Sequence, residues 1–347
     1  MKRFAYGMIA GVVAFVAGLL AGYSALTIGW PSSLPAPAIG RLIHVDEKLR
    51  FLRDRPELDP RILAVGSSIA WRQLDGLAFG AAAGGRARFF NGATAFLKIH
   101  QTADLLDFYL AHFRHVDTVL ILTNQEDFSD CTTLPAAMLD HGAAAEYAFG
   151  DWPSVYFYFR YFSPQRYLRA ASSLVRRRRP LVGDLYLDAY GSGPVMVPAS
   201  KERGLRYRPV DPDPACTDDL IALSHRLTAR KLRLVVVFPP IHPDYRKAYP
   251  ETVAWTERTV ARLTAETAAD KTLIVPLYDD PRFAAEDFYD AYHLQWPGAQ
   301  RLSAIVAAIM AQPGTRKPAA DGDSAVPIAE AAGDQSPQNK TSPHGTP

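Results

Sequence analysis

The sequence predicts an α/β protein with a mainly parallel five-stranded sheet, preceded by one N-terminal transmembrane helix. Short, continuous apolar runs alternate with segments of helical periodicity, and such runs are typical of strands buried on both faces. The expected strands are 61–65, 87–90, 118–122, 232–238 and 272–277. The expected helices are 96–113, 218–230, 252–268 and 298–310. Helices that alternate with parallel strands cover both faces of the sheet.

The transmembrane helix is expected because residues 4–28 carry no charged side chain and are long enough to cross a bilayer. Lys2 and Arg3 precede this run, which favours a start in the cytoplasm and a single pass through the inner (cytoplasmic) membrane. The rest of the chain then lies in the periplasm or outside. A cleaved signal peptide is the alternative, although the bulky Tyr23 makes the segment 23–25 a poor cleavage site.

Glycines at 7 and 11, and again at 18 and 22, have the spacing that lets membrane helices pack closely. A membrane acyltransferase is one partner that such a surface could bind. The other interpretation is that glycine is simply common in membrane helices.

Four regions follow from these patterns: a cytoplasmic start and anchor at 1–30, a linker with a short helix (39–53) at 31–60, the sheet domain at 61–312, and a disordered tail at 313–347. An insertion at about 130–215 is too long for an ordinary connection. Its aromatic block at 155–162 could lie at the bilayer interface, line a saccharide groove or pack internally. Its basic run at 176–179 could contact anionic lipid or an acidic polymer, or form a solvated loop.

Composition narrows the classes of partner and cofactor. The chain has 347 residues and a net charge of +2, which offers no support for a nucleic-acid partner. Its two cysteines, Cys131 and Cys216, lack the spacing of a zinc site and either pair with each other or remain free thiols. The histidines do not cluster at ligand spacing, so we expect neither a metal nor another cofactor.

Gly66, Ser67 and Ser68 follow directly after the first expected strand. A sharp turn from strand to helix exposes a side chain at the carboxyl edge of the sheet, where open α/β sheets bind ligands. A serine at that edge can attack an acyl carbon if a base takes its proton. The alternative is a serine that only caps the following helix.

Asp290 and His293 follow the last strand and precede the last helix, so they are expected at the same edge of the sheet. A carboxylate three residues before a histidine can orient the imidazole and stabilise its charged form. A helix-capping aspartate beside a surface histidine is the alternative. The shared position favours a triad of Ser68, His293 and Asp290.

The negative charge that develops on a substrate carbonyl oxygen needs hydrogen-bond donors. Asn91 and Gly92 follow the second strand, and a glycine amide can approach a substrate closely. Asn124 follows the third strand, and its side-chain amide is a suitable donor. With the backbone N–H of Ser68 these residues supply donors from three adjacent strand ends, although either asparagine alone is more often a turn residue.

Taken in order, Gly66-x-Ser68, Gly92, Asn124 and Asp290-x-x-His293 resemble the four sequence blocks of the SGNH (GDSL) hydrolase superfamily. The resemblance covers about 61–310 and is interrupted by the insertion. It implies a flavodoxin-like three-layer α/β/α sandwich. It also implies that Ser68 is the nucleophile, His293 the base and Asp290 its orienter, with an oxyanion hole formed by the Ser68 and Gly92 amides and the Asn124 side chain.

Two positions depart from the superfamily pattern. Ser67 stands where many members have Asp, although Gly-Ser-Ser occurs in the branch that acts on cell-surface polymers. The third block usually reads Gly-x-Asn-Asp, and here residues 122–125 read Leu-Thr-Asn-Gln. Candidates for the substrate rim are Ser67, Asn91 and His242, and the alternative for His242 is that its Pro-rich loop only shapes the rim.

These features predict an extracytoplasmic SGNH-type serine esterase or O-acyltransferase that handles an acyl group, most simply acetyl, through an acyl-enzyme. The expected partners are an acyl ester donor and a glycan or polysaccharide acceptor, as in the related membrane-anchored branch. A membrane-anchored, non-catalytic SGNH-like domain that binds polymer or serves as a scaffold for a membrane acyltransferase is the alternative.

Overall fold

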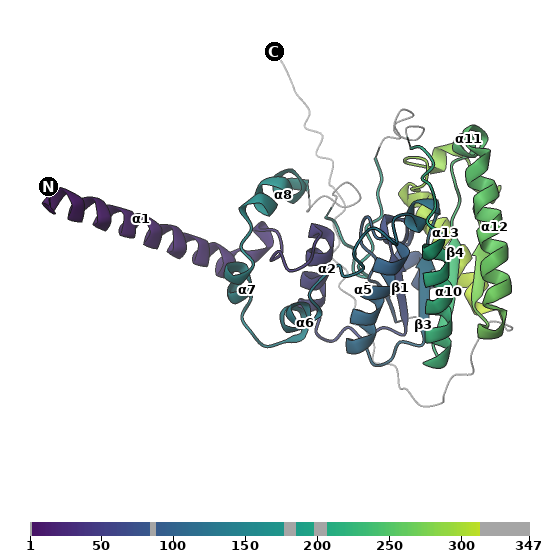
Figure 1. The fold of residues 1–347 in the computed structure, drawn as a ribbon, viewed down its shortest axis with the longest axis horizontal. Coiled ribbons are helices and arrows are strands. Elements are labelled where there is room, and N and C mark those ends of the chain that lie inside the picture. Colours follow the sequence, from purple (N-terminus) through teal and green to yellow (C-terminus); the bar gives the residue numbers. More distant parts are fainter. Residues whose placement is uncertain (1, 84–87, 177–184, 198–206, 313–347) are drawn as a thin grey trace, which may run out of the picture. The chain divides into compact units, whose positions relative to one another are not determined.

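The computed structural model of the protein describes residues 2–83, 88–176, 185–197 and 207–312. Within these residues, five parallel strands form one sheet in the order β2-β1-β3-β4-β5 (Figure 1). The strands are β1 (Ile62–Gly66), β2 (Phe89–Asn91), β3 (Thr118–Leu122), β4 (Arg233–Phe238) and β5 (Leu273–Pro276). The predicted α/β fold and five-stranded sheet are confirmed, and the strand order is that of flavodoxin-like doubly wound sheets.

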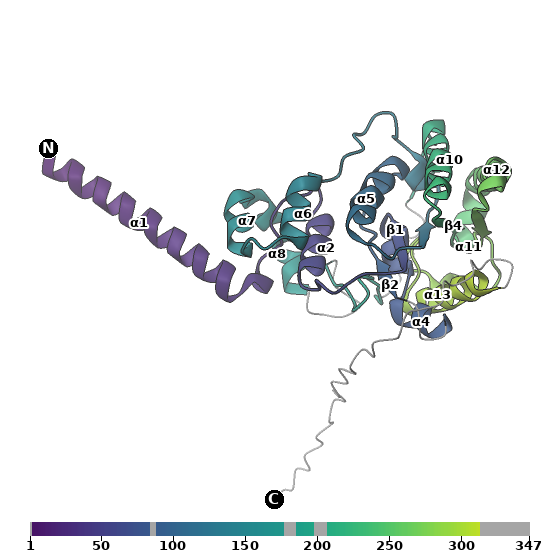
Figure 2. The ribbon, with the colours of Figure 1, turned by 90° about the horizontal axis from the view of Figure 1, so that it is seen from below.

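Helices cover both faces of the sheet, as Figure 2 shows. One face packs against α5 (Ile99–His112), α10 (Pro214–Ala229) and α12 (Pro250–Glu266), with α2 (Ile43–Arg53) and α6 (His141–Phe149) at its margin. The other packs against α3 (Ser68–Gln73), α4 (Gly76–Ala82), α11 (Pro243–Ala248) and α13 (Trp296–Ala311). Alternating strand residues enter the two cores: Val119 and Ile121 join the first, and Leu120 and Leu122 the second.

Four short 3-10 turns complete the described elements: η1 (Pro31–Ser33), η2 (Gln125–Phe128), η3 (Ala268–Asp270) and η4 (Ala285–Asp287). The expected helix 96–113 begins only at Ile99, because Phe96 has a left-handed φ of 64° that a helix cannot include. The amide of Lys98 then donates to the side chain of Gln101 and starts the helix. Residue 87, the expected start of the second strand, lies outside the described residues, as does the predicted tail 313–347.

The N-terminal helix α1 (Lys2–Gly29) is long and apolar enough to cross a membrane, and its apolar stretch packs against no other described part of the protein. Such a helix fits an anchor or a signal sequence. The last turns of α1, in contrast, contact the rest of the protein. Tyr23 donates a hydrogen bond to the carbonyl of Tyr158, and its hydroxyl lies 2.6 Å from that of Tyr167.

The insertion contributes α6, α7 (Ser154–Arg160) and α8 (Pro164–Arg176), and α7 lies beside the C-terminal end of α1 (Figure 1). Phe157 and Tyr158 of the aromatic block are buried in the domain, which is the internal-packing interpretation. Tyr156 and Phe159 remain more than a third exposed. One part of the aromatic block is therefore buried and the other is exposed. Of the basic run, residues 177–179 lie outside the described residues.

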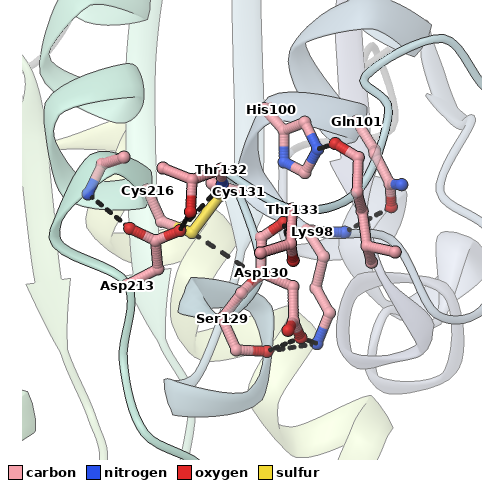
Figure 3. The surroundings of a disulfide bond; sticks show 12 residues. Lys98, His100, Gln101, Ser129, Asp130, Cys131, Thr132, Thr133, Asp213 and Cys216 are labelled. Carbon is pink, nitrogen blue, oxygen red and sulfur yellow. Dashed lines mark hydrogen bonds and ion pairs between the residues drawn. A yellow bond between two sulfur atoms is a disulfide. The ribbon is translucent and has the colours of Figure 1, made fainter.

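Cys131 and Cys216 form a disulfide with a Cα–Cα distance of 5.4 Å (Figure 3). The two cysteines are 85 residues apart and stand at the two ends of the insertion. Asp213 supports the same junction, because its carboxylate accepts bonds from the amide and hydroxyl of Thr132, both at 2.8 Å. The pairing that the sequence left open is thus present, and it closes the insertion at its base.

Candidate active site

Ser68 lies at the carboxyl end of β1, in the first turn of α3. Gly66 makes the turn possible: its φ is +140°, and a Cβ there would lie 2.9 Å from the carbonyl oxygen of Leu122. Ser67 caps α3 by accepting a hydrogen bond from the amide of Ile69 at 3.2 Å. Ser67 is therefore the helix cap and Ser68 the residue whose side chain points toward a base.

The structure brings the three predicted triad residues together. The Nε2 atom of His293 lies 2.9 Å from Oγ of Ser68, and its Nδ1 lies 2.9 Å from Oδ2 of Asp290. His293 is only partly exposed and Asp290 is buried. This chain of contacts allows an imidazole to take the serine proton while a carboxylate holds the ring in the required tautomer.

Asp290 also organises the turn that carries His293. Its Oδ1 accepts the backbone amides of Tyr292 at 2.9 Å and His293 at 2.8 Å. Burial raises the pKa of the Asp290 carboxyl, but the charge of His293 and these hydrogen bonds outweigh it, and the net pKa lies below its ordinary value. Gln73 of α3 donates to the carbonyl of Tyr292 at 2.6 Å, which ties the serine helix to the histidine loop.

Two of the predicted oxyanion donors have unoccupied N–H groups among the described residues: the backbone amide of Ser68 and the side-chain amide of Asn124. The Nδ2 atom of Asn124 is buried, while its Oδ1 accepts the amide of Glu126 at 3.1 Å. A buried donor with no acceptor is costly unless a ligand supplies one. The strand register places these donors side by side, because Gly66 of β1 pairs with Leu122 of β3.

The third predicted donor, the Gly92 amide, is not available. It donates to the carbonyl of Ala64 at 2.8 Å, because the parallel pairing with β1 continues one residue past Asn91. Further along this loop, the amides of Ala95 and Phe96 have no acceptor among the described residues, and both residues line the pocket beside Ser68. The amide of this loop nearest the pocket is therefore not the predicted Gly92 but that of Ala95 or Phe96.

The three candidate rim residues do not lie on the pocket wall. Asn91 is fully buried, and its side chain bonds the carbonyl of Ala70 at 3.0 Å and the hydroxyl of Ser192 at 3.1 Å. Ser67 is buried as a helix cap. His242 caps α11 by accepting the amide of Asp244 at 3.1 Å, and burial lowers the pKa of its imidazole. All three side chains bond nearby backbone groups and do not line the pocket.

A pocket of about 690 Å³ opens over Ser68 and His293. Its floor comes from the sheet edge: Ser68, Trp71, Arg72, Ala95, Phe96, Tyr289, Asp290 and His293. Its opposite wall comes from the end of the linker, the first turn of α2 and the insertion: Arg41, Leu42, Ile43, His44, Ser163, Gln165, Arg166, Arg169, Ala170, Ser173, Leu185 and Tyr207. Sequence reasoning missed nearly all of these residues. Arg72 alone had a local signal, since it lies four residues after Ser68 on one helix face.

One group of metal-ligating residue types occurs among the described residues: His100, Cys131 and Asp219. Cys131 is part of the disulfide, so its sulfur is not a thiolate ligand. The two ligands that remain, His100 and Asp219, are fewer than the four of a structural zinc site. The group belongs to the base of the insertion (Figure 3) and lies outside the pocket.

Asp127 links the residues that follow β1 and β3. Its carboxyl accepts a hydrogen bond from Thr123 at 3.0 Å and also bonds Ser67. Burial raises the pKa of Asp127 to about 7, and the bonds from Ser67 and Thr123 only partly oppose this. The protonated form is therefore the one that the folded protein stabilises near neutral pH.

The substitution Asp127→Asn should remove the loss of stability that the wild-type protein undergoes as pH rises. Because the folded pKa is raised, the stabilising contribution is complete below the ordinary pKa near 3.8 and is lost as pH rises through about 7. The stability advantage of the variant over the wild type should therefore grow by about 3 kcal/mol between pH 5 and pH 8. Thermal unfolding at both pH values measures this, with the exposed Asp279→Asn as control. Parallel pH profiles for wild type and Asp127→Asn would contradict it.

No protein-family model matches the chain, and a search of curated proteins finds no relative. The functional assignment therefore depends on the geometry of the site.

Proposed function

We propose that the protein is a serine-dependent acyl-group enzyme that transfers an acyl group to a glycan hydroxyl or to water. The observation that carries the proposal is the continuous contact from Ser68 through His293 to a buried, ionised Asp290. This contact occurs at the carboxyl edge of a parallel sheet, on the floor of a pocket. An ordered Ser-His-Asp arrangement is recognised by such geometry on many unrelated folds.

In the first half-reaction, Oγ of Ser68 attacks the acyl carbon of an ester while its proton passes to Nε2 of His293. The Oγ–acyl bond forms, the bond to the leaving alkoxide breaks, and His293 returns the proton to that oxygen. In the second half-reaction, a glycan hydroxyl or water attacks the acyl-enzyme, and Ser68 regains its proton. Hydrolysis makes the protein an esterase, and transfer makes it an O-acyltransferase.

The Ser68 amide and the Asn124 side chain stabilise the negative charge on the carbonyl oxygen, with an amide from Ala95 or Phe96 in place of Gly92. Preorganised donors of this kind contribute about 10²- to 10³-fold each to the rate. The pocket favours a short acyl group such as acetyl, because its lining is mixed and includes four arginines. A long acyl chain would require a continuous apolar channel.

The membrane assignment is part of the same proposal: α1 anchors the protein in the cytoplasmic membrane, with the sheet domain in the periplasm or outside. The length and apolar character of α1 support it, as does the absence of charge between Lys2–Arg3 and Arg41. The disulfide supports an oxidising compartment, because disulfides persist mainly outside the cytosol.

Reaction of the detergent-solubilised full chain with a fluorophosphonate probe tests the triad. We expect one adduct, mapped by mass spectrometry to Ser68, because only an activated serine attacks phosphorus readily. His293→Ala should lower the labelling rate by at least about 10³-fold, since the base is lost. The matched control is His115→Ala, which removes an exposed histidine paired with Asp59.

Folded wild-type protein that fails to label would exclude the enzyme and leave the alternative, a non-catalytic polymer-binding or scaffold domain. Labelled protein is then assayed with an acetyl ester, with and without an oligosaccharide acceptor. Acetylated oligosaccharide identifies a transferase, and release of acetate alone identifies an esterase.

A further inference from the structure

The pocket over Ser68 is strongly cationic. Four arginines line it: Arg41, Arg72, Arg166 and Arg169. The one carboxylate among the described lining residues is Asp290, which is buried and bound to His293. One carboxylate against four guanidinium groups leaves a net positive charge among the described lining residues.

Two of these arginines, Arg166 and Arg72, are held in place by contacts with other parts of the protein. Arg166 forms an ion pair with Asp46 at 2.7 Å and donates to the carbonyl of Gly40 at 2.9 Å. The guanidinium of Arg72 lies 4.2 Å from the centre of the Trp71 ring and donates to the carbonyl of Gly193 at 3.2 Å. Their charges contribute to the potential of the pocket, but their side chains are held in place.

Arg41 and Arg169 are different, because neither guanidinium has a carboxylate partner among the described residues. The backbone of Arg41 is fixed by its amide, which donates to the carbonyl of Met138 at 2.9 Å. Arg169 lies on α8 beside Ala170, which is buried and seats that helix. Both side chains are exposed and reach into the pocket from rigid positions. Guanidinium groups so placed are suited to bind a carboxylate or a phosphate.

We infer that the substrate bound over Ser68 is an acidic saccharide, as ester or acceptor, whose anionic group is held by Arg41 and Arg169. The inference rests on the proposed acyl-transfer function and adds the substrate class. The rest of the lining favours a saccharide over a lipid, because the half-buried or exposed rings of Tyr207 and Tyr289 line the pocket. The side chains of Ser163, Gln165 and Ser173 offer hydrogen bonds. A lipid would need a larger aliphatic surface.

Binding to the full-length Ser68→Ala protein in detergent tests this without turnover. The probes are a glucuronic acid trisaccharide and the matching neutral glucose trisaccharide. We expect the acidic probe to bind about tenfold more tightly, which corresponds to about 1.4 kcal/mol. Arg41→Gln/Arg169→Gln should remove that preference, and about 1 M salt should weaken it through screening. The matched control is Arg258→Gln, an exposed arginine on α12 outside the pocket.

Equal affinity for the two trisaccharides, or the same loss in Arg258→Gln, overturns the inference. Binding of phosphatidylglycerol vesicles that depends on Arg41 and Arg169, without binding of the acidic trisaccharide, overturns it in favour of a lipid headgroup. Fluorophosphonate labelling of Ser68 reports on the acyl-enzyme separately. Labelling without acidic preference removes the substrate class alone, whereas acidic preference without labelling removes the catalytic function alone.

Discussion

Asp290→Asn should reduce kcat/KM for an activated acetyl ester by about 10⁴-fold, or roughly 5 kcal/mol of transition-state stabilisation. The buried carboxylate accepts a hydrogen bond from the Nδ1–H of His293, and this tautomer leaves Nε2 free to take the proton of Ser68. An asparagine amide presented to Nδ1 would favour the opposite tautomer, with the proton on Nε2. That imidazole cannot act as the base.

The variant should fold normally, because an asparagine Oδ1 can still accept the amides of Tyr292 and His293. Circular dichroism and an unchanged melting temperature check this, and hydrolysis of p-nitrophenyl acetate measures the rate. Asp279→Asn, an exposed site, is the control. A loss smaller than about tenfold would mean that Asp290 only shapes the turn.

Cys131→Ser/Cys216→Ser should lower the melting temperature by about 8 °C. The bond closes a loop with a sequence separation of 85, and the chain-entropy account gives about 4.5 kcal/mol for a loop of that length. Differential scanning fluorimetry in detergent measures the shift. Dithiothreitol should lower the wild-type melting temperature by a similar amount and leave the double variant unchanged. A wild type that is insensitive to reduction, with free thiols by mass spectrometry, contradicts the pairing.

The fold was predictable because its signals are local and repeated. Apolar strands such as 118–122 are too short and too continuous to form amphipathic helices, and their alternation with helices requires parallel pairing. The ends of elements were less predictable. The helix expected from residue 96 starts at Ile99, because the left-handed backbone of Phe96 depends on the loop beneath it rather than on its side chain.

The meeting of Ser68 and His293 was predictable because each follows a strand, and the carboxyl ends of parallel strands lie along one edge. The candidate oxyanion donors were less predictable than the meeting of these two side chains. The Gly92 amide donates to the carbonyl of Ala64 because the pairing between β1 and β2 continues one residue past Asn91. The sequence alone does not show where that pairing stops. Arg41 and Arg169 reach the pocket from segments far apart in sequence, and no local pattern encodes that meeting.

The contact between Tyr23 and Tyr167 has a consequence for how the protein can move. Tyr167 belongs to α8, and the same helix supplies Arg166 and Arg169 to the pocket wall. In the proposed membrane arrangement, a change in the tilt of α1 would act on that wall through this contact. Bilayer thickness would then become a variable that can alter the width of the pocket.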